Sequence, residues 1–123
     1  CAVLGNNEII ASTVGEIIPA DDFYSYDAKY NNPSSYTKIP ADISEELQKQ
    51  IQDLAIKAFK VIDGKGLSRV DFFVEQGTNK IYLNEINTMP GFTNISMYPC
   101  LMNSIGFEYS KLIDELIRLG LEH

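Results

Sequence analysis

The stretch LSRVDFFVEQGTNKIYLNEIN, residues 67–87, decides the fold of this chain. Two runs rich in β-branched and aromatic residues, 67–76 and 80–87, flank a Gly-Thr-Asn turn at 77–79, which predicts a β-hairpin. Successive side chains of a strand point to opposite faces, so the apolar residues at 70, 72 and 74 mark the core side. The other face is then expected to carry Arg69 and Asp71 on the first strand and Leu83, Glu85 and Asn87 on the second.

The loop length determines which of these side chains meet. A three-residue loop pairs Asp71 with Glu85 and Arg69 with Asn87. A two-residue loop would set Asp71 opposite Ile86 and mix the polar and apolar faces, so we expect the three-residue loop.

The paired carboxylates on this face have two interpretations. Directly opposed residues have Cβ atoms about 4.5–5.5 Å apart, where like charges are unfavourable without a cation nearby. In the simpler interpretation Arg69 neutralises one carboxylate and the face is solvated. In the other, Asp71, Glu85 and the Asn87 amide form an all-oxygen ligand set, which suits Mg²⁺ and implies a nucleotide, because magnesium keeps waters and phosphates in its shell.

The flanking sequence predicts an α+β domain with a mainly antiparallel sheet. A short hairpin is expected over 2–10, a strand over 14–19 and a long loop, rich in Pro, Asn and Ser, over 20–42. Apolar residues at helical spacing predict a helix from Ile43, with Asp42 and Glu45 as its capped start and Gly64 as its stop. A helical turn over 97–105 precedes a final helix over 107–119. We expect the long and terminal helices on one face of the sheet and the acidic site on the other.

Composition excludes several classes of protein. The 123 residues carry a net charge of -7, the wrong sign for binding nucleic acid or an anionic membrane surface. Cys1 and Cys100 are too few for a disulfide framework, which indicates a reducing, cytoplasmic location. The only histidine, His123, lies in a Leu-Glu-His end, 121–123, that looks like an expression-tag remnant, so histidine catalysis is not expected. A start within a strand and without Met predicts a fragment of a longer protein.

A longer motif carries a resemblance. The segment GLSRVDFFVEQGTNKIYLNEINTMPGFTNISMYP, residues 66–99, resembles the carboxy-terminal signature of D-alanine–D-alanine ligases of the ATP-grasp superfamily. FYSYDAKY, 23–30, resembles that family's mobile ω-loop, and AVLGN, 2–6, also matches. The resemblance covers residues 1–119, about the last third of a complete ligase. It implies an ATP-grasp carboxy-terminal subdomain over 1–120, with the ω-loop at about 20–42.

The resemblance also implies roles for the residues of the acidic face. Asp71 and Glu85 would hold one Mg²⁺, and Glu85 and Asn87 a second, with Mn²⁺ as a substitute. Two such metals neutralise charge during phosphoryl transfer. Arg69 and the backbone N–H of Gly91 would stabilise the acyl phosphate and the later oxyanion.

Four further residues match substrate positions of the family. Ser96 and the backbone of Met97, at an expected helix start, would grip the carboxylate of the second D-alanine. Lys29 would reach the γ-phosphate of ATP. Tyr30 would close the second substrate site, which favours the dipeptide product over D-alanyl-D-lactate.

The implied activity belongs to the full-length protein. It would use ATP to activate one D-alanine as an acyl phosphate, join it to a second D-alanine for peptidoglycan synthesis, and act as a cytoplasmic homodimer. The fragment alone lacks the adenine pocket and is expected to be inactive without the missing amino-terminal part. A D-alanine–D-serine or D-alanine–D-lactate ligase, or a glutathione-synthetase-like enzyme, remains open. A non-catalytic magnesium-nucleotide module is the alternative from another class.

Overall fold

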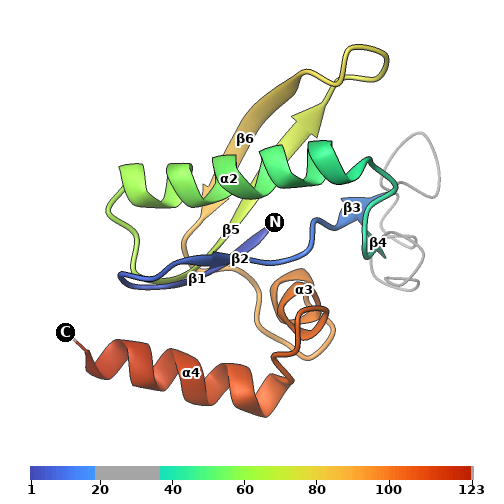
Figure 1. Ribbon diagram of the computed structural model, residues 1–123. Helices are drawn as coiled ribbons and strands as arrows, with labels where there is room; N and C mark the ends of the chain where they lie inside the picture. The colour runs from blue at the N-terminus through green and yellow to red at the C-terminus, as the bar shows by residue number, and fades with distance from the viewer. Residues whose placement is uncertain (19–36, 123) are drawn as a thin grey trace.

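The computed structural model describes residues 1–18 and 37–122 (Figure 1). In chain order its elements are β1 (Ala2–Gly5), β2 (Ile10–Ala11), β3 (Glu16–Ile17), β4 (Thr37–Lys38), α2 (Glu45–Val61), β5 (Gly66–Val74), β6 (Ile81–Asn87), α3 (Met97–Asn103) and α4 (Tyr109–Leu121). All four strand pairings are antiparallel, in a four-stranded sheet of order β2-β1-β5-β6 and a two-stranded sheet of β3 and β4. The expected α+β class with an antiparallel sheet is confirmed. Most of the expected loop over 20–42 lies outside the described residues, and its described end contains β4.

The long helix α2 begins two residues later than its apolar pattern suggests, at Glu45 and not at Ile43. Its N-cap is Ser44, whose side chain accepts the N–H of Leu47 at 3.1 Å, and not Asp42. Ser is as good a cap as Asp, and its oxygen here satisfies an N–H group that has no partner within the helix. After the helix, the N–H of Gly64 donates to the carbonyl of Phe59 at 2.9 Å, which closes the chain reversal at the expected stop.

Helices cover both faces of the four-stranded sheet (Figure 1). On one face α2 packs against Val3 and Val70 through Leu47, Ile51, Ala55 and Phe59. On the other face Ala2 and Leu4 pack against Tyr98, Leu101 and Met102 of α3 and Leu112 and Leu119 of α4.

The expectation that the long and terminal helices share one face is therefore wrong. The reason lies in β1, where Ala2, Val3 and Leu4 are all buried, so both faces of this strand need cover. A continuous apolar run, unlike an alternating one, is typical of a strand that is buried on both sides.

The hairpin of β5 and β6 has the expected pairing at its base. Asp71 is the partner of Glu85, and Arg69 is the partner of Asn87. The expected three-residue loop is nevertheless wrong, because the N–H of Glu75 donates to the carbonyl of Lys80 at 2.9 Å and the turn takes four residues, 76–79.

A β-bulge reconciles this turn with the register of the base. Asp71 pairs with Glu85, but Phe72 pairs with Leu83, so Asn84 is an extra residue without a partner in β5. A bulge of this kind shifts the register by one residue on one strand. Leu83 is consequently opposite Phe72 on the core-facing side, and the expectation that it shares a face with Glu85 is wrong.

Candidate functional site

A hydrogen-bonded network on the hairpin joins three of the expected site residues. The Arg69 guanidinium donates to both oxygens of Asp71, from Nε to Oδ1 and from Nη2 to Oδ2, each at 2.9 Å. The amide nitrogen of Asn87 donates to Oδ2 of Asp71 at 3.1 Å and to the Arg69 carbonyl at 3.3 Å. The bidentate geometry fixes the guanidinium plane as well as its distance.

The charges of this network are only partly screened by solvent. The side chains of Arg69 and Asp71 are 24% and 22% exposed. The pKa of Arg69 is raised above its usual value, chiefly by the hydrogen bond to Asp71, with desolvation acting in the opposite direction and Glu85 adding a favourable charge. Arg69 is therefore a fixed positive charge beside two carboxylates.

The oxygen atoms of this face fit a hard divalent cation. Glu85 is exposed and directly opposite Asp71, and Asn87 brings an amide oxygen beside them. Each carboxylate oxygen has two lone pairs, and Arg69 uses one on each oxygen of Asp71, so acceptor capacity remains at Oδ1. Within residues 1–18 and 37–122, no cluster of three or more His, Cys, Asp or Glu residues suits a metal ion. The expected ligand set has two carboxylates, so it depends on the amide as its third member.

Gly91 and Ser96 lie close together in the segment that connects β6 to α3. A Cβ atom built on Gly91 would lie 3.3 Å from Oγ of Ser96. Ser96 is the N-cap residue of α3, but its side chain makes no capping bond to the helix. Its Oγ instead accepts the N–H of Thr93 at 3.0 Å and lies 2.8 Å from Oγ1 of Thr93.

The same segment is fixed to the helices by Phe92. The hydroxyl of Tyr109 in α4 donates to the Phe92 carbonyl, and the Phe92 ring lies 5.5 Å from the Tyr109 ring and 6.0 Å from that of Tyr98. Tyr98 is fully buried and donates to the Val3 carbonyl at 2.8 Å. Burial raises its pKa above the usual range.

Sequence reasoning missed two residues that hold the candidate site. Thr93 binds Ser96, and the fully buried Ser68 donates to the Asn87 carbonyl at 3.1 Å. Ser68 could have been found, because a polar residue at a core-facing strand position needs an internal partner. Thr93 gives no such signal in the sequence.

The remaining expected residues divide between the described and undescribed parts of the chain. Met97 lines a surface hollow that Arg69 and Asp71 also line. Lys29 and Tyr30 lie outside the described residues.

Among residues 1–18 and 37–122, no helix is long and apolar enough to cross a membrane.

Comparisons with known proteins identify the family to which the chain is similar. The family model described as D-ala D-ala ligase C-terminus matches residues 1–118. The D-alanine–D-alanine ligase of Acetivibrio thermocellus is 58% identical over 122 residues, which are 99% of this chain and 32% of that protein.

Two solved structures are similar in fold and sequence. The D-alanine-D-alanine ligase from Coxiella burnetii matches with a TM-score of 0.83 and 46% identity, over 99% of this chain and 31% of that one. The VanG D-Ala:D-Ser ligase from Enterococcus faecalis matches with a TM-score of 0.79 and 40% identity, over 97% and 34%. The chain thus spans about a third of the length of the relatives that it matches. Because the family model matches nearly the whole chain, the chain belongs to the D-ala D-ala ligase C-terminus family.

Proposed function

We propose that the full-length protein containing this chain uses ATP to join two D-alanine molecules through an acyl phosphate. The observation that carries the proposal is the Arg69–Asp71–Asn87 network, which lies directly across the hairpin from Glu85. Together with Glu85, the network puts one fixed cation and three oxygen-bearing side chains on one face. Relatives that match this chain at 58% identity are D-alanine–D-alanine ligases, which supports the assignment of the reaction.

Asp71 and Asn87 of the network, together with Glu85, would hold the metal ions. Asp71 and Glu85 would bind one Mg²⁺ and Glu85 and Asn87 a second, as the family resemblance implies, with Mn²⁺ as a substitute. When bound, these ions supply positive charge beside the phosphate oxygens of ATP. Asn87 would have a second role in this scheme, since its N–H donates to the Asp71 carboxylate and its amide oxygen would be left to bind the metal.

Arg69 and Gly91 would stabilise negative charge on the reacting carboxyl group. The Asp71 carboxylate already orients the guanidinium of Arg69, so little reorganisation is needed when charge develops on the substrate. The N–H of Gly91 would add a neutral donor, and the absence of a side chain lets the substrate approach closely.

Four residues would bind the two substrates. Ser96 and the Met97 backbone would hold the carboxylate of the second D-alanine. The Ser96 hydroxyl, which accepts the Thr93 N–H, can direct its own proton toward a carboxylate. Lys29 would contact the γ-phosphate and Tyr30 would close the acceptor site, both by resemblance.

D-serine is the second candidate acceptor. The chain is 40% identical to the matching part of the VanG D-Ala:D-Ser ligase, which supports D-serine as a second candidate. Offering D-alanine, D-serine and D-lactate to the same preparation separates these specificities. We expect D-alanine to be preferred, and replacement of Tyr30 to change the preference.

The test is dipeptide formation by the full-length protein with ATP, Mg²⁺ and D-alanine, measured together with phosphate release. The Glu85→Gln variant should lose turnover, and Glu75→Gln is its matched control, because Glu75 is an exposed carboxylate at the far end of the same hairpin. Magnesium-dependent ATP binding without turnover would instead identify a non-catalytic nucleotide-binding module. Equal turnover in wild type and Glu85→Gln would mean that the acidic face is only a solvated surface.

The setting of the reaction follows from the same resemblance. A ligase of this kind supplies peptidoglycan synthesis, works in the cytoplasm and assembles as a homodimer. The part of the protein that carries the adenine pocket and the first D-alanine site would precede Cys1.

A further inference from the structure

A glycine before β3 lies in close contact with α3. A Cβ atom built on Gly15 would lie 2.8 Å from Cδ2 of Leu101 and 2.9 Å from Cε of Met97, both in α3. Carbon atoms in contact are normally about 3.5–4.0 Å apart, so these two side chains occupy the space that a side chain at position 15 would need. Gly15 is not among the residues with positive φ, so a glycine is required here for space and not for backbone conformation.

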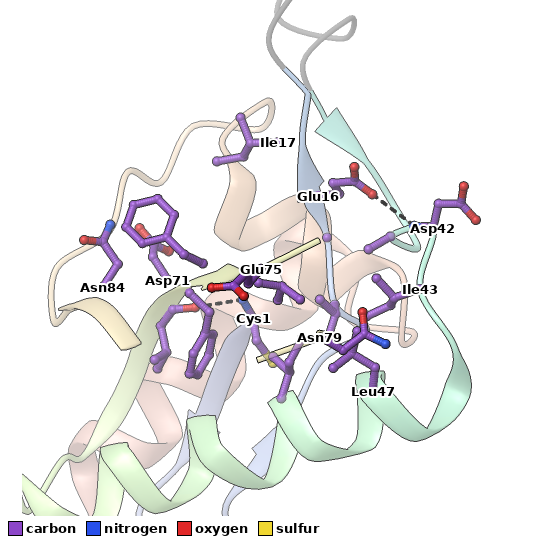
Figure 2. Close-up of a pocket in the computed structure, with 18 of the residues that line it drawn as sticks. Cys1, Glu16, Ile17, Asp42, Ile43, Leu47, Asp71, Glu75, Asn79 and Asn84 are labelled. Atoms are coloured by element: carbon purple, nitrogen blue, oxygen red, sulfur yellow. Dashed lines mark hydrogen bonds between the residues drawn. The ribbon is translucent and has the colours of Figure 1, made fainter. Parts of the chain in front are cut away.

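The chain is fixed on both sides of Gly15. Val14 is buried under α2, and its carbonyl accepts the N–H of Ala41 at 2.8 Å. Glu16 lies in β3, which pairs with β4, and its Oε1 accepts the N–H of Asp42 at 3.1 Å (Figure 2). The backbone at Gly15 therefore cannot move away from α3 without breaking these contacts.

The two α3 side chains differ in how easily they can move. Leu101 is fully buried and belongs to the cluster in which Ala2 and Leu4 of β1 pack against α3 and α4. Met97 is only half-buried, and its unbranched side chain can adopt another rotamer. A methyl group added at Gly15 could displace the end of Met97, but it could displace Leu101 only by shifting α3, because the core around Leu101 is closely packed.

The first turn of α3 carries the residues expected to bind the acceptor. Met97 is the first residue of α3, and Ser96 directly precedes it. A hollow of about 610 Å³ is lined by Gly15 and Met97 and also by Arg69 and Asp71 of the hairpin (Figure 2). The contact between Gly15 and α3 therefore influences how far Ser96 and Met97 lie from the Arg69–Asp71 pair.

We propose that Gly15 is a positioning residue for the acceptor amino acid. This role rests on the proposed function, in which Ser96 and the Met97 backbone bind the acceptor carboxylate. Because Gly15 has no side chain, the segment before β3 contacts α3 directly and fixes its first turn where these groups meet the carboxylate. Gly15 does not touch the substrate and acts through Met97 and Leu101. Small errors in the position of a reactant are costly, so this contact matters for catalysis.

Steady-state kinetics of the full-length protein test the proposal. Gly15→Ala should raise the KM for the acceptor D-alanine about tenfold, because overpacking moves the first turn of α3. The KM for ATP, the KM for the first D-alanine and kcat should stay within about twofold of wild type. Dipeptide formation at varied D-alanine, fitted with a separate KM for each site, measures this. Gly120→Ala is the matched control, because a Cβ built there meets nothing within 4 Å.

A second substitution distinguishes positioning from a general loss of stability. Leu101→Val removes the Cδ2 atom that a methyl group at position 15 would meet. Combined with Gly15→Ala, it should bring the acceptor KM back to within about threefold of wild type, because α3 can return to its place. Phe59→Leu, which shortens a buried side chain under α2, should lower Tm without raising the acceptor KM.

The contact itself has a readout that does not depend on activity. In the substrate-free full-length protein with ¹³C-labelled methionine methyl groups, Gly15→Ala should shift the resonance of the Met97 methyl group. Met97→Leu identifies that resonance by removing it. The signal of Met89, whose side chain is 92% exposed, should stay in place, and Gly120→Ala should move neither signal.

The outcomes separate this role of Gly15 from the proposed function. An active Gly15→Ala protein with an unchanged acceptor KM, or with an unmoved Met97 signal, would overturn the positioning role alone. A higher acceptor KM in the double variant than in Gly15→Ala would also overturn it, because the loss would then come from destabilisation. A wild-type protein that forms no dipeptide would overturn the proposed function and the positioning role together.

Discussion

Backbone pairing holds the hairpin half of the candidate site, whereas side-chain hydroxyls hold the half between β6 and α3. Arg69, Asp71 and Asn87 are placed by the β5–β6 register and joined by four side-chain hydrogen bonds. Gly91 and Ser96 instead depend on Thr93 and, through Phe92, on Tyr109. The two halves are therefore held by different kinds of contact, so they should respond differently to substitution.

The largest expected effect is on the hairpin half. Arg69→Met in the full-length protein should lower kcat by about 10²–10³-fold, because a preoriented donor to developing negative charge is lost. Steady-state phosphate release measures it. Lys49→Met, which removes a cation from an exposed pair with Asp53 on α2, should stay within about twofold of wild type. An equal loss in both variants would mean that overall charge, and not the position of Arg69, matters.

The next largest effect is expected at Tyr98, whose ring contacts Phe92 in the segment between β6 and α3. Tyr98→Phe keeps the ring but leaves the buried carbonyl of Val3 without its donor, which should cost about 1–3 kcal/mol of unfolding free energy. Denaturant unfolding measures this loss. Tyr109→Phe is the comparison, because its hydroxyl is in an exposed bond and should cost less, about 0.5–1.5 kcal/mol. The reverse order would contradict the burial argument.

Tyr98 also gives the stability a dependence on pH. Its pKa is raised in the folded state, so the folded protein keeps a proton that the unfolded chain loses above its ordinary pKa of 10.0. Stability should therefore decrease as the pH rises above about 10, and this decrease should be smaller in Tyr98→Phe.

A smaller effect is expected at Gly91. A methyl group there would lie 3.3 Å from Oγ of Ser96, which Thr93 holds in place, so Gly91→Ala should weaken acceptor use by about tenfold in kcat/KM. Kinetics with varied D-alanine measure it. Gly120→Ala is the matched control, because a Cβ built there meets nothing within 4 Å. Unchanged kinetics at Gly91 would show that the segment adjusts freely.

The smallest effect should come from Thr93. Thr93→Val removes the contact between the two hydroxyls but keeps the backbone donor to Ser96, so the KM for the acceptor should rise about threefold while kcat is nearly unchanged. Thr93→Ser should restore the wild-type KM. A fall in kcat without a change in KM would instead assign Thr93 to the chemical step.

The sequence was sufficient for the part of the site that strand alternation controls. The pairing of Asp71 with Glu85 and of Arg69 with Asn87 was predicted by counting back from a three-residue loop, which was chosen because a two-residue loop would mix the polar and apolar faces, and this pairing is confirmed. The turn length was predicted wrongly, since a two-residue and a three-residue loop were compared without a bulge. The bulge at Asn84 has no marker in the sequence that separates it from an ordinary strand residue.

The rest of the site could not be predicted because it depends on contacts between distant parts of the chain. Tyr109 binds a carbonyl 17 residues earlier, and Tyr98 binds one 95 residues earlier. The presence of helices on both faces of the sheet could in principle have been predicted from the apolar run in β1. A run of three apolar residues also fits a buried turn of helix, however, so the run alone does not decide it.

Because Asn84 is an extra residue in β6, the tip and the base of the hairpin should differ in how well they tolerate insertions and deletions. The tip, 75–80, follows one register and the base, which carries Asp71 and Glu85, follows another. Homologues can therefore change the length of the tip by one residue and compensate by losing or gaining the bulge, without turning any carboxylate away from the site. Variation in hairpin length among ligases is then expected to occur at the tip and at Asn84 together, while the residues from 85 to 87 keep their spacing.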